Sequence, residues 1–227
     1  EKERVISQER LIGMGVIVVC GAGNGAGSTT IAIAVSQYLA GLRKKVVLAE
    51  RCRYPVLWAI KDRLHSNVKA MPGSSYFAHN AKIDSAPICP GDADYMIVDL
   101  GNLYEPNPEE IRKPNEGVLK LHPCFHEIYR ASMVIVCCGT QPWHVLNMQP
   151  LYNIPELEDM LERGAIVVTP NRRAAVDLKR YSRAVQAPYF QDPFKSGDEA
   201  KIFFDELLEP VLPSEKPGLL ARLRSRI

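Results

Sequence analysis

The chain has 227 residues, of which 46% are hydrophobic and 24% are charged. This composition is typical of a globular protein with one substantial core, and it excludes a disordered, collagen-like or coiled-coil chain. A formal net charge of +2 gives no general attraction to nucleic acid or membranes, so such an attraction must be local. No apolar run approaches the ~20 residues that span a bilayer, and residues 1–13 form a charged segment without the apolar core of a signal peptide.

Taken in chain order, residues 14–20 form a continuous apolar run rich in Val and Ile, which predicts a central parallel strand. The run leads into a glycine cluster over residues 21–27. Residues 28–42 then carry small and apolar side chains at helical spacing, and residues 45–50 predict a second short strand. A strand, a glycine turn, a helix and a strand together make one βαβ unit.

The same pattern of a buried strand returns at residues 94–100, 131–138 and 164–170. Residues 66–92 have weak periodicity and predict a short strand plus a loop, and a closing helix is predicted over residues 198–208. Alternating buried strands and helices predict an α/β fold with a doubly wound, mostly parallel sheet and helices on both faces. Ligands of such sheets bind at the carboxyl ends of the strands.

We expect one domain over residues 14–208, followed by a Pro-rich link and a basic tail over residues 209–227. As a helix, residues 218–227 would place four apolar side chains on one stripe, beside arginines and without an acid. A short basic amphipathic helix suits an anionic membrane surface. A helix that docks on its own domain or on a partner is the alternative.

Six cysteines occur, and no two of them have CxxC spacing. Several lie inside apolar runs, which is typical of buried, reduced thiols and predicts a cytoplasmic protein. If the tail binds lipid, the protein would also make a peripheral contact at the inner face of the cell membrane. His122, Cys124 and His126 offer three metal ligands within five residues. A tetrahedral zinc site needs four, and the remaining candidates, His79 and Cys89, are distant in sequence, so a metal role is left open.

A glycine-rich turn between a buried strand and a helix gathers backbone N–H groups at a positive helix end, where phosphate is the usual ligand. Two motifs compete for this turn. The dinucleotide-binding fingerprint is matched by Gly21, Gly23 and Ala26, and Glu50 ends the next strand, where a ribose-binding carboxylate is expected. The P-loop motif instead takes residues 27–30, Gly-Ser-Thr-Thr, with a serine in place of its lysine.

The wider chain favours the P-loop. The turn Gly-Asn-Gly-Ala-Gly-Ser-Thr-Thr over residues 23–30 is followed by strands that end at Glu50, at Asp99 and at residues 138–140. In this order the chain resembles the MinD/ParA family of deviant Walker-A ATPases, including its pilus-localising TadZ/CpaE branch, over roughly residues 14–208. The resemblance implies a P-loop NTPase-like fold in which ATP drives dimerisation and binding to a partner or membrane.

Carried over position by position, the resemblance implies that ATP or ADP binds with Mg²⁺, which Thr29 holds directly and Asp99 holds through water. Asn171 falls at the corner that touches the base in the family, although an Asn in a turn after Pro170 is the alternative. Residues 187–193 are similar to the family segment that closes over the base. The implied nucleotide-binding residues are Gly23, Asn24, Gly25, Ala26, Gly27, Ser28, Thr29, Thr30 and Asn171.

The chain departs from the family at its charged positions. Gly23 stands where the family has the signature lysine that reaches across the dimer, and Ser28 stands where it has the phosphate-binding lysine. Cys52 replaces an acid that helps position the attacking water. Because phosphoryl transfer depends on cations at the β/γ oxygens, these losses predict a pseudo-ATPase with weak or no hydrolysis and no catalytic residue. Arg51 and Arg53 are replacement cations or, alternatively, solvated surface side chains.

We therefore expect a ParA/MinD-like nucleotide-binding switch or scaffold for the localisation or assembly of a larger machine. It is expected to be a homodimer with protein partners from that machine and with no specific nucleic acid. Two alternatives stay open at this point: a Rossmann-type NAD(P)-binding enzyme or sensor, and a degenerate scaffold that binds no nucleotide.

Overall fold

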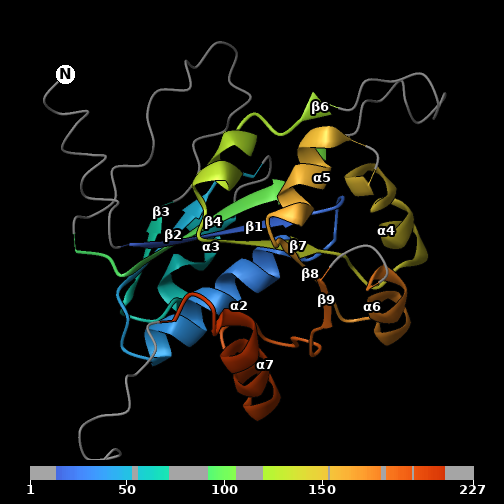
Figure 1. Cartoon of the computed structure of the whole chain (residues 1–227). Helices are drawn as coiled ribbons and strands as arrows, with labels where there is room; N and C mark the ends of the chain where they lie inside the picture. Colours follow the sequence, from blue (N-terminus) through green and yellow to red (C-terminus); the bar gives the residue numbers. More distant parts are fainter. Residues whose placement is uncertain are drawn as a thin grey trace, which may run out of the picture.

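The structure is a computed structural model that describes residues 14–52, 56–71, 92–105, 120–152, 154–179, 183–195 and 197–212. Seven strands form a sheet in the order β3-β2-β4-β1-β7-β8-β9, and all of its pairings are parallel. Helices lie on both faces of this sheet (Figure 1). The predicted doubly wound α/β fold is confirmed.

The elements have the following bounds. The strands of the sheet are β1 (Gly15–Gly21), β2 (Val46–Glu50), β3 (Val68–Met71), β4 (Tyr95–Asn102), β7 (Met133–Cys137), β8 (Ile166–Thr169) and β9 (Arg183–Gln186). Two short strands, β5 (Tyr104–Glu105) and β6 (Lys120–Leu121), form a separate antiparallel pair. The α-helices are α2 (Ser28–Gly41), α3 (Leu57–Ile60), α4 (Pro142–Leu146), α5 (Pro155–Glu162), α6 (Arg172–Leu178) and α7 (Asp198–Leu208), and the 3-10 helices are η1 (Lys61–Arg63), η2 (Phe125–Arg130) and η3 (Gln149–Tyr152).

The five strands predicted from buried apolar runs all occur, with ends shifted by one or two residues, and the helix at residues 198–208 has the predicted bounds. The short strand expected within residues 66–92 is β3. Strand β9 was not predicted. It lies at the edge of the sheet and only Ala184 among its four residues is fully buried, so it lacks the continuous apolar run that marks a central strand.

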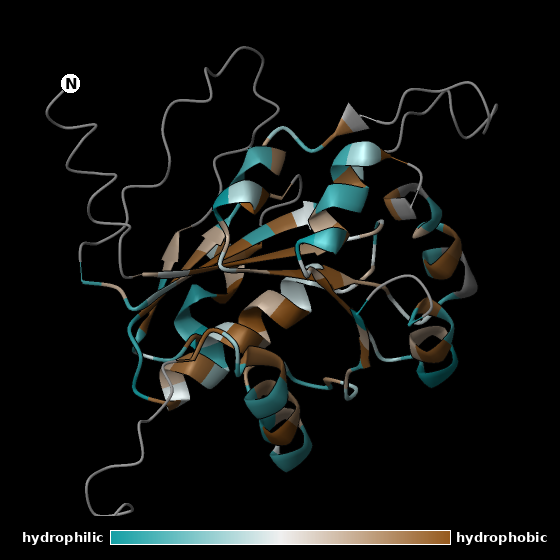
Figure 2. Ribbon diagram, viewed as in Figure 1, coloured by the Kyte–Doolittle hydropathy of each residue, from teal (hydrophilic) through white to brown (hydrophobic). Residues whose placement is uncertain are grey.

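The central position of β1 explains its unbroken apolar sequence, because its two faces contact two different cores. Ile17 and Val19 belong to a core shared with α2 and α7. Val18 and Cys20 point to the opposite face, into a core shared with η2, α5 and α6. Figure 2 shows the result as hydrophobic strands between helices whose outer faces are hydrophilic.

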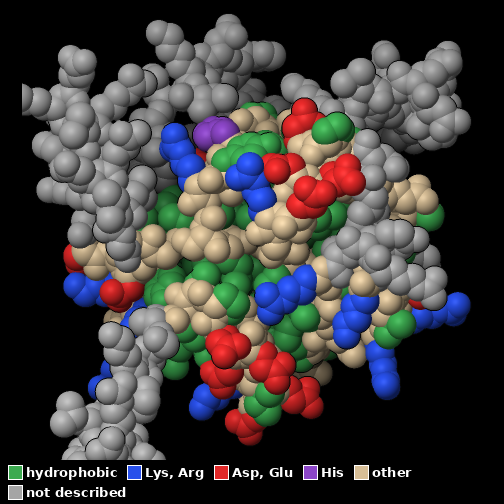
Figure 3. Space-filling view, viewed as in Figure 1, with side chains coloured by type: hydrophobic (Ala, Val, Ile, Leu, Met, Phe, Trp, Pro, Cys, Tyr) green, Lys and Arg blue, Asp and Glu red, His purple; other side chains and the backbone are tan. Residues whose placement is uncertain are grey.

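Helix α7 closes the first of these cores. It buries Phe204 against Tyr38 of α2, with ring centroids 5.4 Å apart, and the Tyr38 hydroxyl donates a hydrogen bond to Asp205. The opposite side of α7 carries acidic side chains, which gather in the lower part of Figure 3. The helix is therefore amphipathic, and its apolar side fixes the position of α2 below the sheet.

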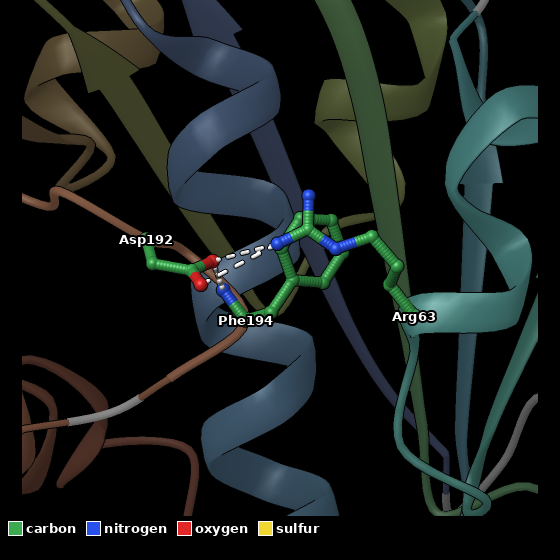
Figure 4. Close-up of polar contacts among 3 residues, drawn as sticks. All are labelled: Arg63, Asp192 and Phe194. Atoms are coloured by element: carbon green, nitrogen blue, oxygen red, sulfur yellow. Dashed lines mark hydrogen bonds and ion pairs between the residues drawn. The ribbon is translucent and has the colours of Figure 1, made fainter.

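The chain between β9 and α7 is fastened to η1. The Arg63 guanidinium lies 3.9 Å from the centre of the Phe194 ring and 3.3 Å from Asp192 Oδ1. Figure 4 shows the dashed contacts between Arg63 and the Asp192 carboxylate. The same carboxylate oxygen accepts a hydrogen bond from the Phe194 backbone N–H at 3.1 Å. This contact joins the segment predicted to close over the base to the chain that follows β2.

No helix within the described residues is long and apolar enough to cross a membrane. Several sequence predictions fall outside those residues. They are the charged segment 1–13, Arg53, His79, Cys89 and the amphipathic tail 218–227.

Candidate nucleotide-binding site

The loop between β1 and α2 has the backbone conformation that its glycines allow. Gly25 has a φ of +75° and Gly27 a φ of +96°, in the left-handed region where a side chain is strained. The Ala26 N–H donates to the Gly23 carbonyl at 3.2 Å and closes a tight turn. The loop thus reverses direction and enters α2 at Ser28 within a few residues.

The first turn of α2 presents backbone donors. The first helical hydrogen bond runs from the Ile31 N–H to the Gly27 carbonyl at 3.0 Å, so the N–H groups of residues 28–30 precede it and have no partner within the helix. The N-cap residue, Gly27, has no side chain with which to accept a hydrogen bond from them. These amides and the positive end of the helix dipole are the groups that the predicted anion cradle requires, and anion binding by them stays a prediction.

The structure brings the two predicted Mg²⁺ ligands together, although they are 70 residues apart in sequence. The Thr29 hydroxyl donates to Asp99 Oδ2 at 2.6 Å, and Asp99 Oδ1 accepts from the Gly101 N–H at 2.9 Å. Strand β4 lies beside β1, which places Asp99 next to the start of α2. A hydroxyl and a carboxylate are oxygen ligands of the kind that Mg²⁺ takes, so this pair fits the metal that the fold implies.

Asp99 is buried, and burial raises its pKa to about 6. The hydrogen bonds from Thr29, Gly101 and Ser28 act in the opposite direction, because they stabilise the charged form. The carboxylate is therefore kept ionised at neutral pH at a cost in free energy. A divalent cation beside it would offset that cost.

Glu50 is not available for a ribose. Its side chain is fully buried, and its carboxylate accepts hydrogen bonds from the N–H groups of Val56 and Leu57 at the start of α3. In addition, β4 separates β2 from β1, whereas the second strand of a dinucleotide-binding fold lies directly beside the first. The Rossmann alternative is therefore wrong for this chain.

Cys52, which stands where the family has an acid, lies against the end of β4. Gly101 has a φ of +68°, and a Cβ atom there would lie 2.6 Å from the Cβ of Cys52. Burial raises the pKa of the Cys52 thiol, and the charges of Asp99 and Glu50 act in the same direction. A neutral thiol does not accept a proton from water, so Cys52 does not substitute for a carboxylate.

The side-chain amide of Asn147 lies against Gly23, the position where the family has its signature lysine. A Cβ atom on Gly23 would lie 2.5 Å from the amide nitrogen of Asn147, which follows α4. A longer side chain at position 23 would have to displace Asn147. The structure thus fills the space beside Gly23 from another part of the chain.

Asn171 caps a helix. Its side-chain oxygen accepts a hydrogen bond from the Ala174 N–H at 3.1 Å, at the start of α6. Its own N–H donates to the Thr169 hydroxyl at 3.2 Å. This is the turn arrangement that was the alternative to a base contact, and the base contact itself stays a prediction.

Two side chains that contact the loop from outside were not predicted from the sequence. The Tyr104 hydroxyl lies between the carbonyls of Ala22 and Asn147, to which it can donate, and the Asn102 amide donates to Asn24 Oδ1 at 2.5 Å. Asn102 is the last residue of β4, the strand that carries Asp99, and Tyr104 lies two residues further on in β5. Their place at the carboxyl end of that strand was the one available signal.

The His122–His126 segment does not form a metal centre among the described residues. His122 Nδ1 accepts a hydrogen bond from the Cys124 N–H at 3.1 Å, which occupies one ligand atom. Within the described part of the chain, no three His, Cys, Asp or Glu side chains gather so that they could hold a metal ion. The five cysteines described there are free and buried, as predicted.

Comparison with solved structures identifies the fold. The chain resembles a plasmid partition protein from Borrelia burgdorferi (TM-score 0.53, 13% identity, 87% of this chain and 100% of that chain) and a ParA family ATPase from Chlorobium tepidum (0.51, 11%, 84% and 92%). It also resembles cobyrinic acid a,c-diamide synthase from Mycobacterium smegmatis, solved with an ATP analogue and magnesium (0.57, 14%, 94% and 97%). No protein-family model and no curated protein matches the sequence. At these identities the likeness shows the fold alone, which is the P-loop NTPase-like fold of ParA-like proteins.

The buried charge of Asp99 predicts a specific pH dependence of stability. The pKa of Asp99 is about 6 in the folded chain against an ordinary 3.8, so the folded state binds the proton more tightly than the unfolded state. The protonated carboxyl therefore adds to the stability of the fold at low pH, and this stabilisation is lost as the pH rises from about 4 to about 6. In chelator, Asp99→Asn should therefore raise the free energy of unfolding at pH 8 by up to about 3 kcal/mol, and the gain should vanish near pH 4.

Urea unfolding at the two pH values measures this difference. Asp177→Asn, which neutralises an exposed acid on α6, is the matched control and should change stability equally little at both. A loss of stability in Asp99→Asn at pH 8 would show that the buried Asp99 carboxylate does not destabilise the fold.

Proposed function

We propose that this chain is a ParA/MinD-like nucleotide-binding switch or scaffold that serves the localisation or assembly of a larger machine, and that it is a pseudo-ATPase. The observation that carries the proposal is the Thr29–Asp99 hydrogen bond at the start of α2, next to a loop without a lysine. The metal ligands and the phosphate cradle are retained, whereas the cations needed for turnover are lost.

The proposed ligand is ATP or ADP with Mg²⁺. The N–H groups of the loop and of the first turn of α2 would hold the phosphates, and Thr29 and Asp99 would hold the metal. When bound, Mg²⁺ neutralises charge on the β/γ-phosphates. The chain's own part is to keep the Asp99 carboxylate ionised and the Thr29 hydroxyl in place through their mutual hydrogen bond.

Hydrolysis lacks its usual charged groups. Residues 21–30 contain no lysine or arginine, and Ser28 supplies a neutral hydroxyl where the family has an ammonium. Arg51 begins the segment after β2, where its backbone N–H donates to the Asp99 carbonyl at 2.7 Å. Its backbone position beside the metal ligand makes Arg51 a candidate replacement cation.

A homodimer or a protein partner is supported by exposed apolar side chains in the segments that follow the carboxyl ends of the strands, which is the end of the sheet that carries the loop. Exposed apolar side chains follow the carboxyl ends of four strands, β2, β7, β8 and β9; they are Trp58, Leu146, Val176 and Tyr189. Such side chains are enriched at protein interfaces. We propose that this end of the sheet associates with a second copy of the chain, and that the tail 218–227 adds a peripheral contact at the cytoplasmic side of the cell membrane.

The first test restores one missing charge. Ser28→Lys should add a charged hydrogen bond to the phosphates and tighten the binding of ATP-Mg²⁺ by about 1–3 kcal/mol, measured by isothermal titration calorimetry. Turnover should stay near background in the same variant, since position 23 and Cys52 remain uncorrected. Leu42→Lys, at the opposite end of α2 and exposed, is the control: it adds the same charge away from the loop and should leave the affinity unchanged.

Two outcomes contradict the proposal. Unchanged nucleotide affinity in Ser28→Lys would mean that this turn does not hold phosphates as a P-loop does. Robust steady-state hydrolysis by the unaltered protein, lost in Thr29→Ala, would mean that the chain is an active ATPase with an unrecognised cation.

The second test concerns self-association. Because position 23 has no lysine to reach a partner's phosphates, we expect light scattering to report the same dimer mass with and without ATP-Mg²⁺. Leu146→Glu should give a monomer, whereas Ile202→Glu on α7, with nearly the same exposure (61% against 62%), should not. A switch from monomer to dimer on adding ATP would contradict a nucleotide-independent interface.

A further inference from the structure

His144 of α4 packs against the phosphate loop. It is buried, with 5% of its surface exposed, and its Nε2 lies 3.2 Å from the carbonyl oxygen of Asn24 at the tip of the loop. Its Nδ1 accepts a hydrogen bond from the Gln141 N–H at 3.2 Å. A Cβ atom on Gly139 would overlap Nδ1, so the ring occupies a space that only a glycine at position 139 leaves open.

These two contacts determine where the ring carries its proton. The Gln141 N–H can only donate, so Nδ1 must be the unprotonated acceptor. The Asn24 carbonyl can only accept, so Nε2 must carry the hydrogen. His144 is thus held as the neutral Nε2–H tautomer, and its N–H points at the Asn24 carbonyl.

The hydrogen bond to Asn24 also fixes the neighbouring N–H of the loop. A peptide bond is planar and trans, so the Asn24 carbonyl and the Gly25 N–H point in opposite directions. Since the carbonyl points at His144, the Gly25 N–H points away from α4. If this peptide turned over, a carbonyl oxygen with a partial negative charge would replace a donor in an anion cradle.

The loop needs such a restraint. Gly25 has a φ of +75° and no side chain, so its backbone passes between conformations at little steric cost. The Asn102 amide restrains only the side chain of Asn24, through Oδ1. Within the described part of the chain, His144 is the residue whose side chain bonds to the peptide itself.

We infer that His144 is a positioning residue for phosphate binding: its Nε2–H holds the 24–25 peptide so that the Gly25 N–H, and not the Asn24 carbonyl, belongs to the anion cradle. The inference rests on the proposed function of this loop in binding a nucleotide. In a loop that lacks both lysines, the backbone donors supply the attraction for phosphate, so the direction of each one matters more than in a loop with those cations.

Two amide substitutions separate this role from simple packing. Glutamine carries its amide nitrogen at about the position of Nε2 and can still donate to Asn24, whereas asparagine reaches only as far as Nδ1. We expect His144→Asn to weaken the binding of ADP-Mg²⁺ and of inorganic pyrophosphate about tenfold, the effect of one neutral hydrogen bond. His144→Gln should stay within about threefold of the unaltered protein.

A nuclear magnetic resonance measurement tests the contact without any ligand. Long-range ¹H–¹⁵N spectra of the unaltered protein should show one neutral His144 ring protonated at Nε2, assigned by its absence in His144→Gln. The Gly25 amide resonance should shift strongly in the asparagine variant and little in the glutamine variant.

The possible failures are distinguishable. If the unaltered protein binds ADP-Mg²⁺ but the asparagine variant binds it equally well, or if the ring is protonated at Nδ1, the inference about His144 is overturned and the proposed function stands. If the unaltered protein binds neither ADP-Mg²⁺ nor pyrophosphate, the proposed function is overturned whatever the tautomer. Equal weakening in both variants would indicate packing alone and would also overturn the inference.

Discussion

The hydrogen bond between the Thr29 hydroxyl and the Asp99 carboxylate joins the start of α2 to the end of β4, and the candidate site depends on it. It exists because β4 is inserted between β1 and β2, which brings the end of β4 beside the glycine loop. The buried carboxylate is costly to ionise, and the chain lowers that cost with donors from Thr29 and Gly101. A buried charge kept in this way marks a candidate functional site, and a cation is the ligand that we propose for it.

In the proposed function, nucleotide binding and nucleotide hydrolysis depend on different groups. Backbone amides and the helix dipole survive side-chain substitution, because every residue except proline carries an N–H. The cations that stabilise the transition state of phosphoryl transfer belong to single side chains and disappear with them. We therefore expect that a serine at position 28 in place of a lysine weakens catalysis more than it weakens affinity. The surroundings of Gly23 agree with this account, since Asn147 occupies the space beside it and leaves no room for a lysine without rearrangement.

The sequence predicted the sheet well because its central strands are buried on both faces and read as continuous apolar runs. Strand β9 was missed for the opposite reason, since it is a short edge strand with polar ends. In the site, the pairing of Thr29 with Asp99 followed from the motif order. The contact of His144 with Asn24 did not, because it joins residues 120 positions apart and neither residue type marks it. The sequence left open whether Glu50 binds a ligand or has a structural role. Its hydrogen bonds to the N–H groups at the start of α3 show the structural role.

The central claim is that the loop, Thr29 and Asp99 form a nucleotide site that needs Mg²⁺. The most direct measurement is calorimetric titration of ATP into the unaltered protein with and without Mg²⁺, repeated with Thr29→Ala. The account predicts binding that Mg²⁺ strengthens at least about tenfold, and it predicts that this strengthening is lost when the hydroxyl is removed. Binding of equal strength with and without Mg²⁺, or the same Mg²⁺ dependence in Thr29→Ala, would contradict it.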